Sequence, residues 1–301
     1  MILRRVAERT LLNVSALLAD RAPANGTLIL AYHGVRPADE PERGERSLHV
    51  GWDRFLAHLD VLERCAQVVS LERALSFAPR EQTVRKQVVI TFDDAYEGAV
   101  QLALPELARR GWPSTVFVPT DFLGTRGFWW DQAAEMTGGA LSSDIRDRAV
   151  DACAGDALLV AKEIPLASVE SLPWYMACAR QEALVEAGRC GLVTLAPHTA
   201  SHVNVAAISE ERLLDEVRRS LAWCQQFESG RPLLAYPYGR WSPSLASLLQ
   251  SAGISHALRV NGGWLTPHVS LSPMAIPRMN VPAGLSAERL ELGLRGYGMR
   301  A

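Results

Sequence analysis

The chain alternates short runs of Val, Ile and Leu with amphipathic stretches, a pattern typical of parallel β-strands joined by α-helices. Amphipathic periodicity predicts helices over Trp52–Glu63 and Glu210–Cys224, the second with Ser209 as its N-cap. A third helix is expected from Ser242–Pro243 to a stop at Gly253. The expected strands are Leu28–Tyr32, Val88–Phe92, Thr115–Val118, Leu192–Leu195, Leu233–Tyr236, His256–Val260 and Met274–Pro277.

Residues 127–191 depart from this alternation. The segment is long, helix-like and rich in Ala, with Trp129, Trp130, Trp174 and Tyr175 near its two ends. We interpret it as a helical insertion that shapes one wall of a cleft. Within residues 1–25 the apolar positions recur at roughly helical spacing, which predicts an N-terminal helix. Polar residues interrupt every apolar run too soon for a signal peptide. The expected organisation is this helix followed by one domain over 26–301.

Composition narrows the classes of function. With 31 basic and 33 acidic residues the formal net charge is -2, which argues against binding to nucleic acid and favours a neutral or sparsely charged substrate. The five cysteines form no C-x-x-C pair, so buried reduced thiols are expected. No stretch is long and apolar enough to span a bilayer. A cytoplasmic protein is predicted, with membrane association only through the N-terminal helix.

Polar residues follow several of the expected strands. Asp93 and Asp94 come directly after Val88–Phe92, and His198 and His202 follow the strand that ends at Leu195. In parallel α/β barrels the active site lies where the strands end. An isolated Asp-Asp pair also suits a surface turn, and an isolated H-x-x-x-H is weak evidence. If residues 198–202 form a helical turn, both rings reach one ion, and with a carboxylate they form an open site suited to Zn²⁺.

A third polar segment, Tyr236-Pro237-Tyr238-Gly239, also follows a strand. Pro-Tyr-Gly forms a tight turn in any context. The backbone N–H groups of that turn are also suited to stabilising an oxyanion.

These three segments together resemble the polysaccharide deacetylase family, carbohydrate esterase family 4, also called the NodB-homology family. The resemblance covers roughly residues 28–280. It implies a distorted (β/α)7 TIM-like barrel and a metal-dependent deacetylase acting on acetylated saccharides. By motif position it implies Asp93 as general base and Asp94, His198 and His202 as metal ligands. It also implies the Tyr238 N–H as an oxyanion donor. The expected ion is Zn²⁺, with Ni²⁺, Co²⁺ or Mn²⁺ as alternatives, and Tyr236, Pro237 and Trp130 are expected to contact the substrate.

The chain departs from the family pattern in two places. Ala235 stands where members usually have an Arg that steadies the base, and Arg278 is a candidate replacement. The late Leu-x-His motif that supplies the general acid is absent, since His268, the last histidine, lies in a Thr-Pro-His-Val turn. His33, in Tyr32-His33-Gly34, resembles the acid of the poly-N-acetylglucosamine deacetylase branch. We therefore assign His33 as general acid, with a histidine bridging strand ends as the alternative. His49, His58 and His256 are expected to be structural or exposed.

Three functions follow from these residues. The first is hydrolysis of the N-acetyl group of an acetamido sugar in glycan or exopolysaccharide metabolism, on an oligomeric, polymeric or lipid-linked saccharide. The second is hydrolysis of a non-sugar amide, as in allantoinase-like relatives. The third is a catalytically silent glycan-binding protein. Retention of both carboxylates and both ligand histidines favours an enzyme.

Overall fold

The computed structural model describes residues 22–23, 26–76, 86–266 and 271–297. The N-terminal helix expected over 1–25 lies almost entirely outside the described residues, and His268 lies outside them.

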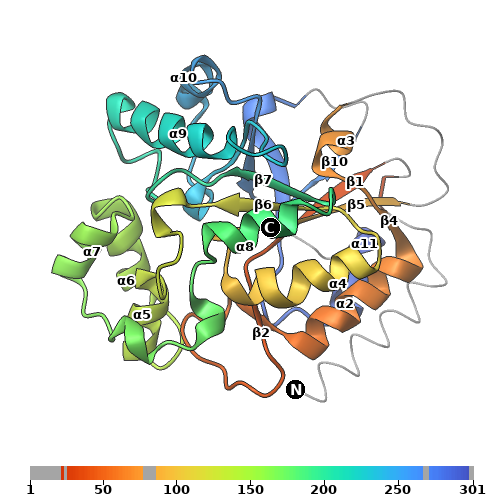
Figure 1. Cartoon of the computed structure of the whole chain (residues 1–301), viewed down its shortest axis with the longest axis horizontal. Helices are drawn as coiled ribbons and strands as arrows, with labels where there is room; N and C mark the ends of the chain where they lie inside the picture. The colour runs from red at the N-terminus through yellow and green to blue at the C-terminus, as the bar shows by residue number, and fades with distance from the viewer. Residues whose placement is uncertain (1–21, 24–25, 77–85, 267–270, 298–301) are drawn as a thin grey trace.

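Seven parallel strands form a nearly closed barrel in the described part of the chain (Figure 1). Their order is β7-β6-β5-β1-β11-β9-β8, and every neighbouring pair on this path is parallel. Between β7 and β8 the gap is bridged at Leu195, which hydrogen-bonds to the backbone of Ser229 and Arg231. The strands are β1 (Thr27–Tyr32), β5 (Lys86–Phe92), β6 (Ser114–Val118), β7 (Val193–Pro197), β8 (Leu233–Ala235), β9 (His256–Val260) and β11 (Ile276–Asn280). The predicted distorted (β/α)7 barrel is thus confirmed.

The apolar runs of the sequence fill both faces of these strands. One buried cluster occupies the barrel interior and takes at least one side chain from each strand, including Ile29, Val89 and Phe117. The alternate positions pack outward against helices, Leu28 and Leu30 of β1 in one cluster and Leu234 of β8 and Ala257 of β9 in another. Strands covered on both faces read as continuous apolar runs, which is why the sequence predicts them well. Phe117→Ala would cost about 3–5 kcal/mol by leaving a cavity in the interior.

Helices surround the barrel, as the sequence predicts. Helix α9 (Glu210–Cys224) has the predicted bounds, and the Ser209 side chain accepts a hydrogen bond from the Arg212 N–H as its N-cap. Helix α2 (Trp52–Cys65) ends two residues beyond the prediction. The other helices outside the insertion are α3 (Leu71–Leu75), α4 (Leu104–Arg109), α10 (Ala246–Ser251) and α11 (Ala287–Leu294), with α4 preceded by the π-helical turn Ala99–Ala103.

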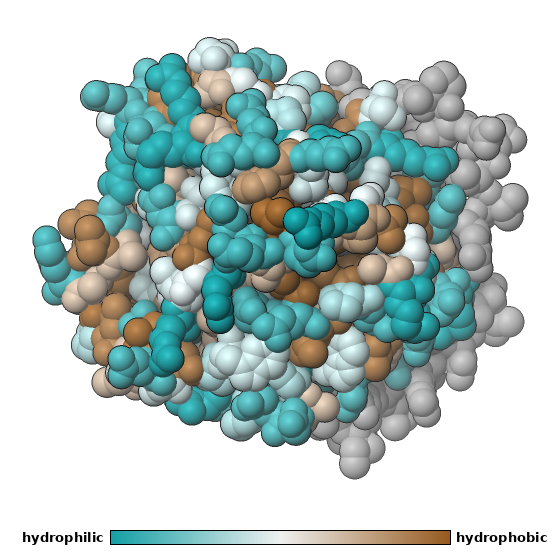
Figure 2. Space-filling view, viewed as in Figure 1, coloured by the Kyte–Doolittle hydropathy of each residue, from teal (hydrophilic) through white to brown (hydrophobic). Residues whose placement is uncertain are grey.

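The segment over 127–191 divides into two parts. Helices α5 (Trp129–Met136), α6 (Ser143–Asp147) and α7 (Ala157–Glu163) gather in a lobe at one side of the barrel (Figure 1). Helix α8 (Gln181–Gly188) instead contacts β7 and joins the ring of barrel helices. Hydrophobic side chains show at the edge of the molecule where α7 lies (Figure 2). Among the described residues, the large hydrophobic side chains that are exposed all lie in this segment: Met136, Leu158, Leu159 and Trp174.

Short strands were missed by the sequence analysis. They are β2 (Gly34–Arg36), β3 (His49–Gly51), β4 (Ala66–Val68) and β10 (Trp264–Leu265). Two or three residues are too few to show a period of two. The strand predicted over Met274–Pro277 is also corrected. A 3₁₀ turn occupies Pro273–Ala275, and β11 continues to Asn280, so Arg278 lies within the strand rather than at its end.

The cysteines carry no disulfide, as expected, but their burial differs. Cys153, Cys178 and Cys224 are buried, Cys65 is half-buried and Cys190 is exposed. The expectation of buried thiols is therefore wrong for Cys190 and only partly right for Cys65. None of the helices that the structure describes has the length and hydropathy that crossing a lipid bilayer requires.

Candidate metal centre and active-site cavity

The polar residues singled out in the sequence meet at the carboxyl ends of the barrel strands. Asp93 and Asp94 follow β5 directly, His198 follows β7 and His33 follows β1. Parallel strands bring their carboxyl ends to one face, so residues distant in the chain meet there.

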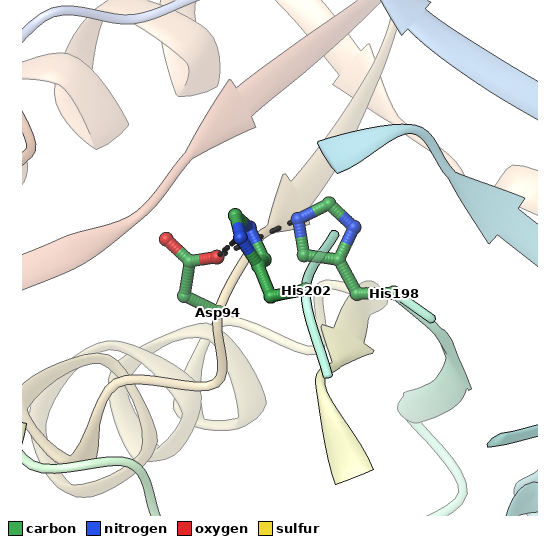
Figure 3. Close-up of side chains that lie close together, drawn as sticks. All are labelled: Asp94, His198 and His202. Atoms are coloured by element: carbon green, nitrogen blue, oxygen red, sulfur yellow. Dashed lines mark ion pairs between the residues drawn. The ribbon is translucent and has the colours of Figure 1, made fainter. Parts of the chain in front are cut away.

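Asp94, His198 and His202 point toward a common point (Figure 3). Their candidate ligand atoms all lie within 4.8 Å of one another, and all three side chains are buried. Asp94 Oδ1 lies 3.0 Å from His202 Nε2 and 3.5 Å from His198 Nε2. Two imidazoles and one carboxylate are the donor set of many catalytic Zn²⁺ sites, which leave further positions open.

The hydrogen bonds around the triad fit a cation. His198 Nδ1–H donates to the Ala235 carbonyl at 2.8 Å, which leaves Nε2 as a lone-pair donor facing Asp94. Asp94 Oδ1 is buried and accepts no hydrogen bond from the described residues. A buried carboxylate oxygen without a donor is costly unless a cation neutralises it. The residues present therefore fit a divalent ion.

The loop that carries the two histidines is not helical, contrary to the helical turn considered from the sequence. Thr199 and His202 have φ values of 61° and 53°, in the left-handed region. The two rings still lie close together, with centroids 4.7 Å apart and ring planes at 75° to one another. Asp94 and Tyr238 are also left-handed, with φ values of 66° and 58°. Such conformations cost non-glycine residues about 1 kcal/mol or more each, and they cluster at functional sites.

A buried glutamate that the sequence analysis missed holds this loop. Glu216 of α9 accepts hydrogen bonds from the Ala200 and Ser201 N–H groups at 3.0 and 2.7 Å, and from the Ser201 hydroxyl. The side chain is only 2 % exposed. The sequence does contain a signal for this residue. Glu216 is an acidic residue on the buried face of α9, and that face is otherwise largely apolar.

Arg278 makes a bidentate ion pair with Asp93. Its Nη1 and Nη2 lie 2.7 and 2.8 Å from the two carboxylate oxygens, and Nη1 also donates to the Thr91 hydroxyl. The guanidinium lies 5.1 Å from the centre of the Phe117 ring and is fully buried. Burial alone would raise the pKa of Asp93, but the charges of Arg278 and His198 and the hydrogen bonds from Arg278 together outweigh burial and hold that pKa below its usual value. Arg278 thus supplies the cation next to Asp93 that Ala235 cannot supply.

His33 lines the same cavity as Asp93 and Asp94. Burial lowers the pKa of His33, while the charges of Asp94 and Asp93 act in the opposite direction. The ring therefore lies close enough to both carboxylates to respond to their charge.

The cavity at the strand ends has a volume of about 710 Å³. Aromatic rings form part of its wall. The rings of Trp130 and Tyr238 each lie 4.6 Å, centroid to centroid, from the ring of His202. The Tyr238 hydroxyl accepts a hydrogen bond from Trp129 Nε1 and donates to the Gly155 carbonyl, which connects the turn after β8 to the lobe.

Of the other candidate substrate contacts, some line the cavity and some do not. Tyr236 lines the cavity, although its hydroxyl donates to the Met274 carbonyl. Pro237 is buried and is not among the lining residues, and Trp174, near the other end of the 127–191 segment, is exposed and does not line the cavity either. His49 and His58 are buried and hydrogen-bonded, and His256 is partly exposed, as expected.

Solved structures share this fold. IcaB from Ammonifex degensii is 19 % identical with a TM-score of 0.62, over 90 % of this chain and 97 % of that one. The Streptococcus pyogenes deacetylase PplD, in complex with acetate, is 18 % identical with a TM-score of 0.61, over 89 % and 97 %. A de-N-acetylase from Aggregatibacter actinomycetemcomitans is 16 % identical with a TM-score of 0.62, over 89 % and 99 %.

The sequence itself also matches a family model. No curated protein matches the chain closely enough to count as a relative. The model described as polysaccharide deacetylase matches residues 80–257, which is more than half of the chain and includes both aspartates, His198, His202 and the Tyr-Pro-Tyr-Gly turn. With a seven-stranded barrel and an Asp-His-His cluster at its carboxyl end, the chain belongs to the polysaccharide deacetylase family.

Proposed function

We propose that this protein is a metal-dependent carbohydrate N-deacetylase, which hydrolyses the N-acetyl group of an acetamido sugar to acetate and an amine. The observation that carries the proposal is the convergence of Asp94, His198 and His202 in a cavity that is also lined by Asp93 and His33. The likeness to structures titled as deacetylases supports it.

Each residue has a distinct part in the proposed reaction. Asp94, His198 and His202 would hold a divalent ion, which would supply Lewis acidity to the acyl carbonyl and to water. Asp93 takes the proton of the attacking water, because the Arg278 ion pair keeps its carboxylate ionised. The Tyr238 N–H helps to hold the oxyanion. His33 gives a proton to the departing amine nitrogen as the C–N bond breaks.

The cavity supports a saccharide substrate. Trp129, Trp130, Tyr236 and Tyr238 line it, and aromatic faces suit the apolar faces of sugar rings. We infer a neutral N-acetylated oligosaccharide or polysaccharide as the substrate class.

The test is acetate release from N-acetylglucosamine oligomers by the purified protein. EDTA should abolish turnover, and added Zn²⁺, Ni²⁺, Co²⁺ or Mn²⁺ should restore it. Asp93→Asn should retain the metal and lose about 10²–10⁴ in kcat. Hydrolysis of allantoin in place of the oligosaccharides would favour a non-sugar amide. A protein that neither binds metal nor hydrolyses either substrate would support a glycan-binding role instead.

A further inference from the structure

Three buried polar side chains form a connected network next to the cavity. His49 of β3, Tyr96 after β5 and Asp131 of α5 are each no more than 4 % exposed, and none of them lines the cavity. His49 Nε2 lies 2.9 Å from Asp131 Oδ1, and the Tyr96 hydroxyl lies 2.7 Å from Asp131 Oδ2. The network therefore connects three segments that are far apart in the chain.

The indole N–H of Trp130, at one end of the network, determines the direction in which the Tyr96 hydroxyl donates. Trp130 Nε1 lies 2.6 Å from the Tyr96 oxygen, and an indole nitrogen can only donate. Tyr96 must therefore accept from Trp130 and direct its own proton to Asp131. The Asp131 carboxylate also accepts from His49 Nε2–H and from the Glu45 backbone N–H. A hydroxyl that donates to a carboxylate becomes a better acceptor, which strengthens its bond with Trp130.

One end of the network meets a residue of the proposed metal site, and the other meets the residue next to the proposed acid. The Trp130 ring packs on His202 at 4.6 Å. At the other end His49 packs against Gly34, which directly follows His33, and a Cβ at Gly34 would lie 2.2 Å from His49 Nδ1. Only glycine fits beside the His49 ring at that position. A Cβ at Gly44 would likewise lie 2.5 Å from Asp131 Oδ1. The backbone thus packs tightly around the network.

We propose that His49, Asp131 and Tyr96 are positioning residues that hold Trp130 against His202, so that helix α5 of the lobe determines how well the metal site is formed. This inference rests on the proposed metal-dependent function. Residues behind a metal ligand commonly change metal affinity by about tenfold to a hundredfold, because they limit the motion of the ligand.

The test compares two tyrosine variants that each remove one buried hydroxyl. Tyr96→Phe removes the acceptor of Trp130. Tyr175→Phe is the matched control, because Tyr175 is equally buried and its ring also lies near His49, but its hydroxyl donates to the Pro41 carbonyl. Zn²⁺ affinity is measured by competition with a chromophoric chelator, and thermal unfolding is measured for both variants without metal. We expect Tyr96→Phe to weaken Zn²⁺ binding about tenfold and Tyr175→Phe to change it less than twofold.

A double-mutant cycle separates positioning from general destabilisation. Trp130→Phe removes the indole N–H, so adding Tyr96→Phe to it should weaken Zn²⁺ binding no further. The indole ¹H–¹⁵N signal that disappears in Trp130→Phe should also shift in Tyr96→Phe and stay in place in Tyr175→Phe. Equal Zn²⁺ affinities of the two tyrosine variants, or additive effects in the cycle, would overturn the inference and leave the proposed function intact. Wild-type protein that binds no divalent ion would contradict both proposals.

Discussion

Arg278 and Asp93 are 185 positions apart in the chain and form a bidentate ion pair inside the barrel mouth. Neither partner is more than 3 % exposed. A charge buried that deeply is tolerated only when it is paired and hydrogen-bonded, and the Thr91 hydroxyl accepts a further hydrogen bond from the guanidinium. The pair therefore explains how a carboxylate stays ionised next to the acidic Asp94.

The first prediction concerns Arg278→Lys. Lysine keeps the charge but cannot form the two parallel bonds, so we expect kcat/KM to fall about tenfold to a hundredfold. Arg278 lowers the pKa of Asp93, so a weaker partner raises that pKa. Asp93 then becomes protonated at a higher pH, and the acidic limb of the kcat/KM profile should move to higher pH. Arg259→Lys is the control, because Arg259 lies in neighbouring β9 and contacts Trp241 instead. An unchanged pH profile in Arg278→Lys would contradict the prediction.

The second prediction concerns His33→Gln. Glutamine is polar and similar in size but cannot give a proton to the leaving amine, so kcat should fall by about 10²–10⁴. The metal content should remain that of the wild type, because His33 is not one of the three converging side chains. Steady-state kinetics and metal analysis measure the two effects, with His256→Gln on β9 as the control. Wild-type turnover in His33→Gln would remove His33 as the acid.

The third prediction concerns Glu216→Gln. The amide has one acceptor oxygen, whereas the carboxylate accepts three hydrogen bonds from the loop between His198 and His202. Losing acceptors for buried donors should lower the free energy of unfolding by about 1–3 kcal/mol, as measured by urea denaturation. Zn²⁺ affinity should fall about tenfold because the loop is less constrained. Glu211→Gln, exposed on the same helix, should change neither quantity. Wild-type Zn²⁺ affinity in Glu216→Gln would show that the loop holds its shape without this anchor.

The fourth prediction concerns stability and pH. Burial lowers the pKa of His58 to about 4 from the ordinary 6.5, and the neutral ring donates to the Leu285 carbonyl while accepting from the Tyr32 hydroxyl. The unfolded chain binds a proton near pH 6.5 that the native protein does not bind until about pH 4. Stability contributed by His58 is therefore present above pH 6.5 and is lost as the pH falls toward 4, by about 3 kcal/mol in all. His58→Gln should remove this part of the pH dependence from urea denaturation curves measured at pH 7.5 and 5. An equal loss of stability between pH 7.5 and 5 in the wild type and in His58→Gln would contradict this prediction.

The sequence predicts the barrel well because its strands are buried on both faces. Val88–Phe92 and Thr115–Val118 are recognisable as uninterrupted apolar or β-branched runs, and the structure extends each of them only at its start. Short strands such as β3 contain too few residues to carry a pattern, and their pairing depends on neighbours elsewhere in the chain.

The candidate site, too, can be predicted from the sequence only in part. Asp93, Asp94, His198 and His202 stand in short local motifs, so their positions after strands could be read from the sequence. The conformation of the histidine loop could not, because it depends on left-handed residues and on a side-chain contact from Glu216 of the following helix. His49 was expected to be structural or exposed, but its partner Asp131 could not be predicted, because a single histidine in a three-residue strand shows no partner.

The sequence alone determined the alternation of strands and helices and the chemical groups that follow each strand. Both features depend only on residues that are consecutive in the chain. The tertiary structure decided which of those groups meet. Arg278 reaches Asp93, and Asp131 joins His49 to Tyr96, only because barrel closure and the packing of α5 bring distant segments together. The physical reason is that hydrophobic patterning specifies local elements, whereas the pairing of buried polar groups depends on contacts between residues remote in the chain.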